Sequence, residues 1–296
     1  MTPRKIAFLA LAAAVLAGAA ALVSRLQSPA EPSRPLARLQ AADVARIELD
    51  YNGAHAALEQ TGGIWRLTAP VQDVADADAA TGLSQSLRGL ALGSEVSREP
   101  SGYADYEVNE SSAARVRVYS RKSAAPLLDG YFGKTAVGDS VYFRPNREAA
   151  IYLAEGVKSY ALRQGAEELR SKAVLSISMG DLRSLKFAGP DGFVLTSSSG
   201  SWLASGRTIS ADQAAEIVLA ATSLRFTGFA PADTPAGKAG FDKPAVDFTA
   251  SGAGRSERVI IGREDTGRRY AKAERGTVGF VSKSDADSLL KLLKRR

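Results

Sequence analysis

The sequence predicts an α+β protein built from two tandem repeats, each an antiparallel strand meander with one amphipathic helix, preceded by one N-terminal transmembrane helix. Three observations predict this fold. An apolar segment lies near the N-terminus, short segments alternate between apolar and polar residues, and the two tryptophans of the 296-residue chain lie 137 positions apart. We therefore divide the chain into a signal anchor or transmembrane segment (1–25), a proline-containing tether (26–40), a first repeat with a helical linker (41–172) and a second repeat with a C-terminal helix (173–296).

The N-terminal segment has the features of a membrane anchor. Eighteen uncharged residues, Ile6–Val23, follow Arg4 and Lys5. As a helix they would rise about 27 Å, near the lower limit for crossing a bilayer, and the preceding bases favour a cytoplasmic N-terminus. We expect a single-pass protein of the inner (cytoplasmic) membrane with its folded part in the periplasm. A cleaved signal peptide with a small-residue site in 17–21 is the alternative, and the absence of cysteine excludes a lipoprotein.

The first repeat begins with a strand in which apolar and polar residues alternate from Ile47 to Tyr51, followed by the hairpin signal Asn52-Gly53. A second turn, Gly62-Gly63, leads to Trp65. A helix follows, because four apolar residues recur with the spacing of one helical face, namely Ala80, Leu83, Leu87 and Leu90. We expect a helical linker over 157–172 to close this repeat.

The second repeat shows the same order of signals. A turn at 190–192 precedes Trp202, and Ser210 is a helix N-cap signal before the next apolar face. A C-terminal helix from Ser284 closes the repeat. Further corresponding positions, which we interpret as structural anchors of the repeat together with the tryptophans, are Gly133 with Gly262 and Tyr142 with Tyr270. We interpret the two glycines as requirements of a turn.

The distribution of charge argues against a nucleic-acid binder. The formal net charge is +6, but residues 1–25 and 291–296 hold seven of the 38 bases and no acid. Residues 26–290 therefore carry 31 bases against 32 acids. A nucleic-acid binder is expected to carry a basic stripe on its folded part. We expect no nucleic-acid partner.

The residue inventory predicts no catalytic centre, cofactor or metal site. The chain has no cysteine and one histidine, which excludes thiolate sites and multi-histidine metal sites. Gly133-Lys134-Thr135 resembles the end of a phosphate-binding loop, but Leu128 stands where that loop needs its first glycine. We interpret His55 as an ordinary strand histidine, because no Gly-x-Ser-x-Gly motif accompanies it.

Several residues allow a structural and a functional interpretation. We interpret Trp65 and Trp202 as matching core anchors, with paired sugar-stacking platforms as the alternative. Arg170 and Lys172 are possible partner contacts, although cations at the end of a helix also interact favourably with its dipole. We interpret the acids Asp73, Asp76 and Asp78 as residues of a helix start, where negative charges interact favourably with the helix dipole.

The chain resembles a family of bacterial envelope proteins known as domain of unknown function 4340, over roughly residues 40–290. The resemblance rests on the N-terminal apolar segment and on a series of short motifs, namely Gly63 to Pro70, Tyr103 to Val108, Phe132-Gly133, Val141 to Arg144 and Glu168 to Lys172. The family pattern often has Tyr-Gly-Leu where this chain has Tyr106-Glu107-Val108. The resemblance implies association with ABC-2-type or gliding-motility-type transport auxiliary systems, and it supplies no catalytic residues.

The resulting hypothesis is a non-enzymatic, membrane-anchored, extracytoplasmic accessory protein that associates with an ABC-type permease or auxiliary protein. The alternative is an envelope glycan- or lipid-binding module, which predicts a cleft lined by an exposed tryptophan. A hydrolase that uses paired carboxylates is the third possibility and predicts two acids about 5–10 Å apart in a cleft.

Overall fold

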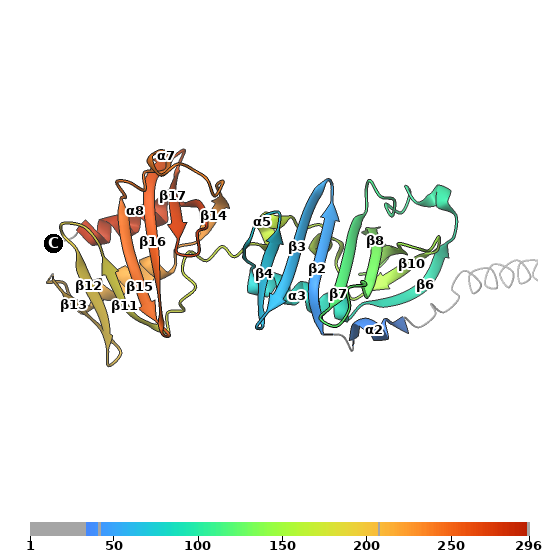
Figure 1. The fold of residues 1–296 in the computed structure, drawn as a ribbon, viewed down its shortest axis with the longest axis horizontal. Coiled ribbons are helices and arrows are strands. Elements are labelled where there is room, and N and C mark those ends of the chain that lie inside the picture. Colours follow the sequence, from blue (N-terminus) through green and yellow to red (C-terminus); the bar gives the residue numbers. More distant parts are fainter. Residues whose placement is uncertain (1–33, 41–42, 207, 295–296) are drawn as a thin grey trace, which may run out of the picture. The chain divides into compact units, whose positions relative to one another are not determined.

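The computed structural model describes residues 34–40, 43–206 and 208–294. The predicted anchor Ile6–Val23 and most of the tether lie outside these residues. Within the described part of the chain, no helix is long and apolar enough to cross a membrane. The structure consists of two antiparallel sheets with a few helices, in agreement with the predicted α+β class, and strands predominate (Figure 1).

The first sheet has ten strands in the order β1-β6-β10-β9-β8-β7-β2-β3-β4-β5. Its strands are β1 (Arg34–Pro35), β2 (Val44–Tyr51), β3 (Ala54–Thr61), β4 (Ile64–Ala69), β5 (Asp73–Val74), β6 (Ala91–Ser97), β7 (Ala114–Ser120), β8 (Leu128–Thr135), β9 (Val141–Pro145) and β10 (Ile151–Glu155). The helical elements of this part are α2 (Ala37–Gln40), α3 (Ala77–Arg88), the 3₁₀ turn η1 (Pro100–Gly102), α4 (Ser159–Leu162) and α5 (Ala166–Leu169).

The second sheet has eight strands in the order β13-β12-β11-β15-β16-β17-β18-β14. Its strands are β11 (Leu182–Phe187), β12 (Phe193–Ser198), β13 (Ser201–Ser205), β14 (Phe226–Phe229), β15 (Val246–Gly252), β16 (Arg255–Asp265), β17 (Arg268–Ala273) and β18 (Val278–Ser282). The helices are α6 (Ala211–Thr222), α7 (Ala236–Ala239) and α8 (Lys283–Lys294).

The two sheets share one strand order. Reading the first sheet from β6 to β4 and the second from β14 to β13, each strand of one has a counterpart at the same place in the other. The tryptophans occupy corresponding strands, since Trp65 lies in β4 and Trp202 in β13. The hairpin signal Asn52-Gly53 is confirmed, because Asn52 and Gly53 have φ of 50° and 77° between β2 and β3. Ala253 and Gly254, between β15 and β16, have φ of 50° and 74°.

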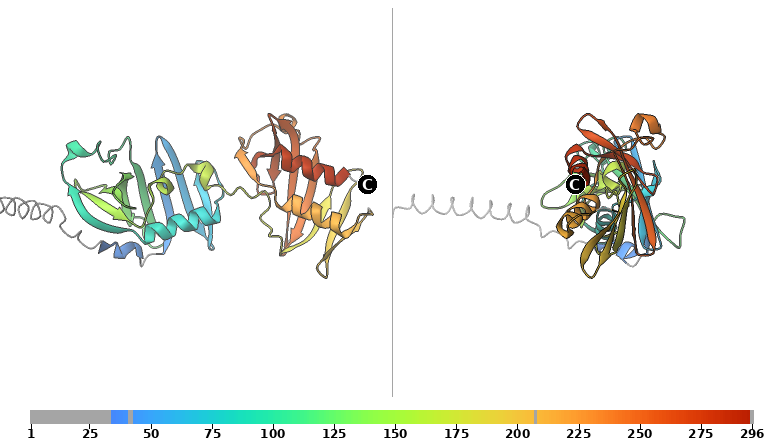
Figure 2. Two further views of the ribbon diagram at one scale, coloured as in Figure 1. Left: turned by 180° about the vertical axis from the view of Figure 1, so that it is seen from behind. Right: turned by 90° about the vertical axis from the view of Figure 1, so that its left-hand side faces the viewer.

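Each sheet buries one face against helices and leaves the other open (Figure 2). In the first sheet, α3 covers one face with its buried residues Ala80, Leu83 and Leu87, as the spacing predicts. Leu90, the fourth residue of the predicted face, is also buried but lies beyond the end of α3. In the second, α6 and α8 pack together on one face. The predicted N-cap is confirmed there, because the Ser210 hydroxyl accepts a hydrogen bond of 3.1 Å from the Gln213 amide.

The interpretation of Gly133 and Gly262 as turn glycines is wrong. Both lie within strands, β8 and β16, and neither has a positive φ. A Cβ on Gly133 would lie 2.0 Å from the carbonyl oxygen of Tyr106, and one on Gly262 would lie 2.0 Å from that of Ala239. The glycines are required because an earlier segment of the chain crosses directly over each strand.

The two crossing segments have the same backbone. Over the first sheet the Val108 amide donates to the Tyr103 carbonyl (2.9 Å), and over the second sheet the Phe241 amide donates to the Ala236 carbonyl (2.8 Å). Between them, Glu107 has φ +55° and Gly240 has φ +74°. Glu107 therefore occupies a left-handed position that glycine adopts without strain, and the family that the sequence resembles often has glycine at this position.

The predicted helical linker over 157–172 is two separate four-residue helices, α4 and α5, divided by residues 163–165. Gly165 stands at this break, and glycine disfavours a continuous helix.

By its contacts the chain forms two compact units. The first ends at Gly63 and resumes from Asp78 to Gly165, and the second takes Ile64–Ala77 together with the chain from Ala166 onward.

Candidate functional site

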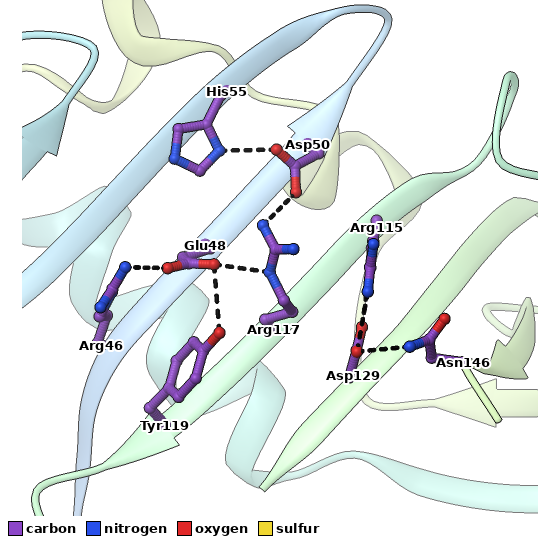
Figure 3. A network of polar contacts seen from close by, with 9 residues as sticks. All are labelled: Arg46, Glu48, Asp50, His55, Arg115, Arg117, Tyr119, Asp129 and Asn146. Atoms are coloured by element: carbon purple, nitrogen blue, oxygen red, sulfur yellow. Dashed lines mark hydrogen bonds and ion pairs between the residues drawn. The ribbon is translucent and has the colours of Figure 1, made fainter. Parts of the chain in front are cut away.

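A polar network covers the open face of the first sheet (Figure 3). Successive strand residues point to opposite faces, so the charged residues of β2 lie on the face that α3 leaves free. Neighbouring strands place further polar side chains beside them. We call this set the open-face network, and its members are Arg46, Glu48, Asp50, His55, Arg115, Arg117, Tyr119, Asp129 and Asn146.

Glu48 is the centre of one half of the network. Its side chain is only 7% exposed and receives the guanidinium group of Arg46 on one carboxylate oxygen. The other oxygen lies 2.6 Å from Arg117 Nε and 3.4 Å from the Tyr119 hydroxyl, which donates to it. Burial, reinforced by the negative charge of Glu48, raises the pKa of Tyr119. The hydroxyl therefore stays protonated and acts as a donor.

Asp50 links this half to the only histidine. Arg117 Nη2 donates to one of its oxygens at 2.7 Å. The other oxygen lies 2.7 Å from His55 Nδ1, directly across the β2–β3 hairpin. Because a carboxylate only accepts hydrogen bonds, the imidazole donates through Nδ1, and Nε2 is left for another group. The His55 side chain is 42% exposed.

Arg115 and Asp129 form the second half. The guanidinium donates two hydrogen bonds to the carboxylate, at 2.9 and 3.0 Å, and Asn146 Nδ2 donates a third at 2.8 Å. The hydrogen bonds that Arg115 donates to Asp129 raise the pKa of Arg115 further above its ordinary value. Tyr131 lies beneath Arg115 and donates to Glu110 at 3.3 Å. The two parallel hydrogen bonds from Arg115 to Asp129 fix the plane of the Arg115 guanidinium group.

An open hollow of about 490 Å³ lies over part of the network, and four of the nine network residues line it. Its walls come from the β2–β3 hairpin, from β7 and β8, and from the segment that precedes β7, with the side chains of Asp50, Asn52, His55, Glu110, Arg115, Arg117 and Tyr131 among the lining residues. The hollow therefore offers donors and acceptors of both charges, held in place by one another. Within the described residues, no group of three or more His, Asp or Glu side chains is placed to hold a metal ion.

The predicted anchors differ in burial, since Trp65 and Tyr270 are buried while Trp202 and Tyr142 are only partly buried. Trp65 is 5% exposed, while Trp202 is partly buried against the core of the second sheet. Neither tryptophan lines this hollow or the one between β11 and α8. The ring of Tyr142 in β9 packs on Tyr106, and that of Tyr270 in the corresponding strand β17 packs on Phe280, both with centroids 4.7 Å apart.

Arg170 is engaged inside the chain. It donates hydrogen bonds of 2.7 and 3.0 Å to Asp73, whose side chain is 2% exposed, and its guanidinium lies 3.7 Å from the centroid of the Phe229 ring. Arg275 and Thr277 also donate to Asp73, at 3.0 and 2.8 Å, within the second contact unit. Lys172, by contrast, is exposed.

The environment of Asp73 differs from the interpretation as a helix-start residue, because Asp73 lies in β5. Burial by itself raises the pKa of its carboxyl group. The hydrogen bonds from Arg170 and Thr277 and the charge of Arg275 outweigh burial, and they hold the pKa below its usual value of 3.8.

The comparisons with known proteins give one match. A family model described as "Domain of unknown function (DUF4340)" matches residues 65–244, more than half of the chain. No curated protein and no solved structure matches the chain. The match includes Trp65, Gly133 and Trp202, and it leaves β2, β3 and His55 outside the matched residues.

Proposed function

The chain belongs to the DUF4340 family, and we propose that it is a membrane-anchored, extracytoplasmic accessory protein that binds a protein component of an ABC-type transport complex. We propose further that its two sheets are tandem copies of one α+β unit. The common strand order and the paired positions of the tryptophans and crossed glycines support this second proposal. The apolar segment Ile6–Val23 supports the anchor.

The observation that carries the proposal is the open hollow on the face of the first sheet. It is wide and polar, its arginines and carboxylates are prearranged by mutual hydrogen bonds, and it has no aromatic stacking platform formed by a tryptophan. A surface with positively charged donors and negatively charged acceptors in fixed positions suits a protein partner, because protein interfaces use many hydrogen bonds around their core.

The proposal is tested by purifying the tagged full-length chain from membranes and identifying bound polytopic permeases by mass spectrometry. Ala54 lines the hollow and is exposed. We expect Ala54→Arg to fill the hollow and to reduce recovery of the permease at least about tenfold. The matched control is Thr196→Arg, on the exposed surface of β12 in the second sheet. Recovery of the chain in the soluble fraction, or equal permease recovery with both variants, would contradict the proposal.

The same two variants separate this function from the glycan- or lipid-binding alternative. Isothermal titration with cell-wall glycan fragments and flotation with lipid vesicles would detect such a module. We expect neither to respond to Ala54→Arg, because Trp65 is buried and neither tryptophan lines the hollow. If the chain bound glycan saturably and Ala54→Arg abolished this binding, the ligand of this surface would be a glycan and not a protein.

A further inference from the structure

The last strand of the second sheet, β13, has a free outer edge. It pairs with β12 on one side, and within the described residues no strand pairs with its other side. Its five residues, Ser201 to Ser205, contain no charge, no proline and no register shift in their pairing with β12. Natural sheets usually protect such edges with charges, prolines, bulges or a covering segment.

The corresponding edge of the first sheet is protected in two ways. Strand β5 covers β4, pairing Val74 with Arg66, and the Ala75 amide donates to the Trp65 carbonyl at 3.1 Å. The charged Arg66 also stands in the middle of that edge. The covering segment exists because α3 begins twelve residues after Trp65, whereas α6 begins nine residues after Trp202. The shorter connection contains no strand equivalent to β5 in its described residues.

The hairpin geometry shows which backbone groups of β13 are free. Ser199 and Gly200 form a two-residue turn with φ of 48° and 84°, and Ser198 pairs with Ser201 on its flanks. The residues that flank a two-residue turn form a hydrogen-bonded pair, so Ser201 bonds inward to β12. By alternation, the N–H and C=O groups of Trp202 and Ala204 point to the open edge. These two residues correspond to Trp65 and Leu67, which bond to the covering segment in the first sheet.

We propose that β13 is a self-association edge that pairs antiparallel with β13 of a second copy of this chain. A two-fold axis at Leu203 places Trp202 of each copy opposite Ala204 of the other copy. This register forms four backbone hydrogen bonds and places Leu203 opposite itself.

Side-chain chemistry favours a second copy as the occupant. Leu203 is 57% exposed, and pairing would bring two such leucines together on the open face. No like charges meet in this register because the strand is uncharged. In β4 the equivalent register would place Arg66 against itself, which disfavours self-pairing.

The expected association is weak and depends on concentration. Five residues per chain form a contact far smaller than the interface of a stable dimer. This surface is separate from the hollow of the first sheet, so the inference does not rest on the proposed function.

Disulfide trapping tests the register directly, since the chain has no cysteine. In the full-length protein in detergent, Leu203→Cys places two thiols at a non-hydrogen-bonded pair. The Cα atoms of such a pair lie about 4.5 Å apart, which suits a disulfide. We expect mild oxidation to give a covalent dimer. Ser205→Cys is the matched control, because in this register it lies far from its own copy and stays monomeric.

A mixture of Ser201→Cys and Ser205→Cys chains completes the test, since the proposed register places these two positions opposite each other. We expect the cross-linked product to contain one chain of each variant. In sedimentation of the cysteine-free protein, Leu203→Arg should raise the dissociation constant at least about tenfold. Equal cross-linking of Leu203→Cys and Ser205→Cys, or sedimentation unchanged by Leu203→Arg, would overturn the proposal.

Discussion

The open faces of the two sheets carry the same ion pair with its polarity reversed. In the first sheet, Arg115 of β7 binds Asp129 of β8 through two hydrogen bonds. In the second, Asp247 of β15 binds Arg258 of β16 through two hydrogen bonds of 2.9 and 2.7 Å. The β8 and β16 members of these pairs each lie four residues before the glycine crossed by an earlier segment. Both sheets thus have an ion pair at the same position, but the strand that carries the positive residue differs between them.

The surroundings of the pair differ between the sheets. Glu48 and Arg117 stand opposite each other on β2 and β7, and the corresponding positions on β11 and β15 are Lys186 and Thr249. Asp50, which binds His55, corresponds to Ala188. The second sheet therefore has the ion pair between Asp247 and Arg258 but lacks the other charged pairs that surround Arg115 and Asp129 in the first sheet. A network that the fold does not require in one sheet is a candidate for function in the other.

The largest difference between the two sheets is expected from the tryptophans. Trp65→Ala should reduce the free energy of unfolding by about 3–5 kcal/mol, because its buried side chain leaves a cavity. Trp202→Ala should cost less, since Trp202 is only partly buried. Urea unfolding followed by circular dichroism measures both. Equal losses would show that the partly exposed ring contributes as much packing as the buried one.

The crossed glycines of the two sheets should respond alike. Gly133→Ala and Gly262→Ala each force a methyl group to within 2.0 Å of a backbone carbonyl oxygen, so each should cost about 3 kcal/mol or more. Gly82→Ala in α3 is the control, because no atom outside the adjoining helix backbone lies within 4 Å of its Cβ position. It should be neutral or stabilising. A tolerated alanine at one crossed glycine alone would show that the two crossings differ.

Asp73 lies in β5, which has no counterpart among the described strands of the second sheet, and it should make the protein sensitive to acid. Its pKa is lowered in the folded state, so its ionised form stabilises the fold above the usual aspartate pKa of 3.8. This contribution is lost as pH falls through the lowered folded-state value. Asp73→Asn should cost about 2–3 kcal/mol at neutral pH, because Arg170 loses its charged partner.

The measurement is the free energy of unfolding of both proteins between about pH 7 and about pH 2. The difference between wild type and Asp73→Asn should shrink at the acid end. A difference that stays constant over this range would assign the loss to packing and not to the charge of Asp73.

The smallest effect is expected from reversing the first ion pair. Arg115→Asp alone should cost about 1 kcal/mol, since both partners are partly exposed and Asp129 would then face a like charge. The double variant Arg115→Asp with Asp129→Arg reproduces the polarity of Asp247 and Arg258, and it should recover most of this loss. A double-mutant cycle in thermal unfolding measures the coupling. An additive loss would mean that Asn146 or Tyr131 fixes the polarity in the first sheet.

Much of the fold is predictable from the sequence because its signals are local. The alternation before Asn52-Gly53 predicts the first hairpin, and Ser210 predicts the start of α6. The role of Gly133 is not local, since it depends on a carbonyl 27 residues earlier in the chain. The left-handed Glu107 is equally hidden, although its equivalence to Gly240 becomes visible once the strands are aligned.

The candidate site is harder to predict, because it is made of cross-strand pairs. The alternating acids of β2 are compatible with an ordinary solvated strand face, and the sequence interpretation placed His55 on such a strand. Only the register of the β2–β3 hairpin brings His55 opposite Asp50, and only that of β7 brings Arg117 to the same carboxylate. The signal available in the sequence is the two-residue Asn52-Gly53 turn, which fixes that register.

The balance of charge within the open-face network has a kinetic consequence. Arg46, Arg115 and Arg117 are matched by three carboxylates at hydrogen-bond or ion-pair distance, so their fields largely cancel beyond the surface. At physiological ionic strength the remaining field decays over about 8 Å. A partner would meet this face without long-range steering, at about 10⁵–10⁶ M⁻¹s⁻¹ and with little dependence on salt. Selectivity at such a surface resides in how long a complex lasts once its hydrogen bonds have formed.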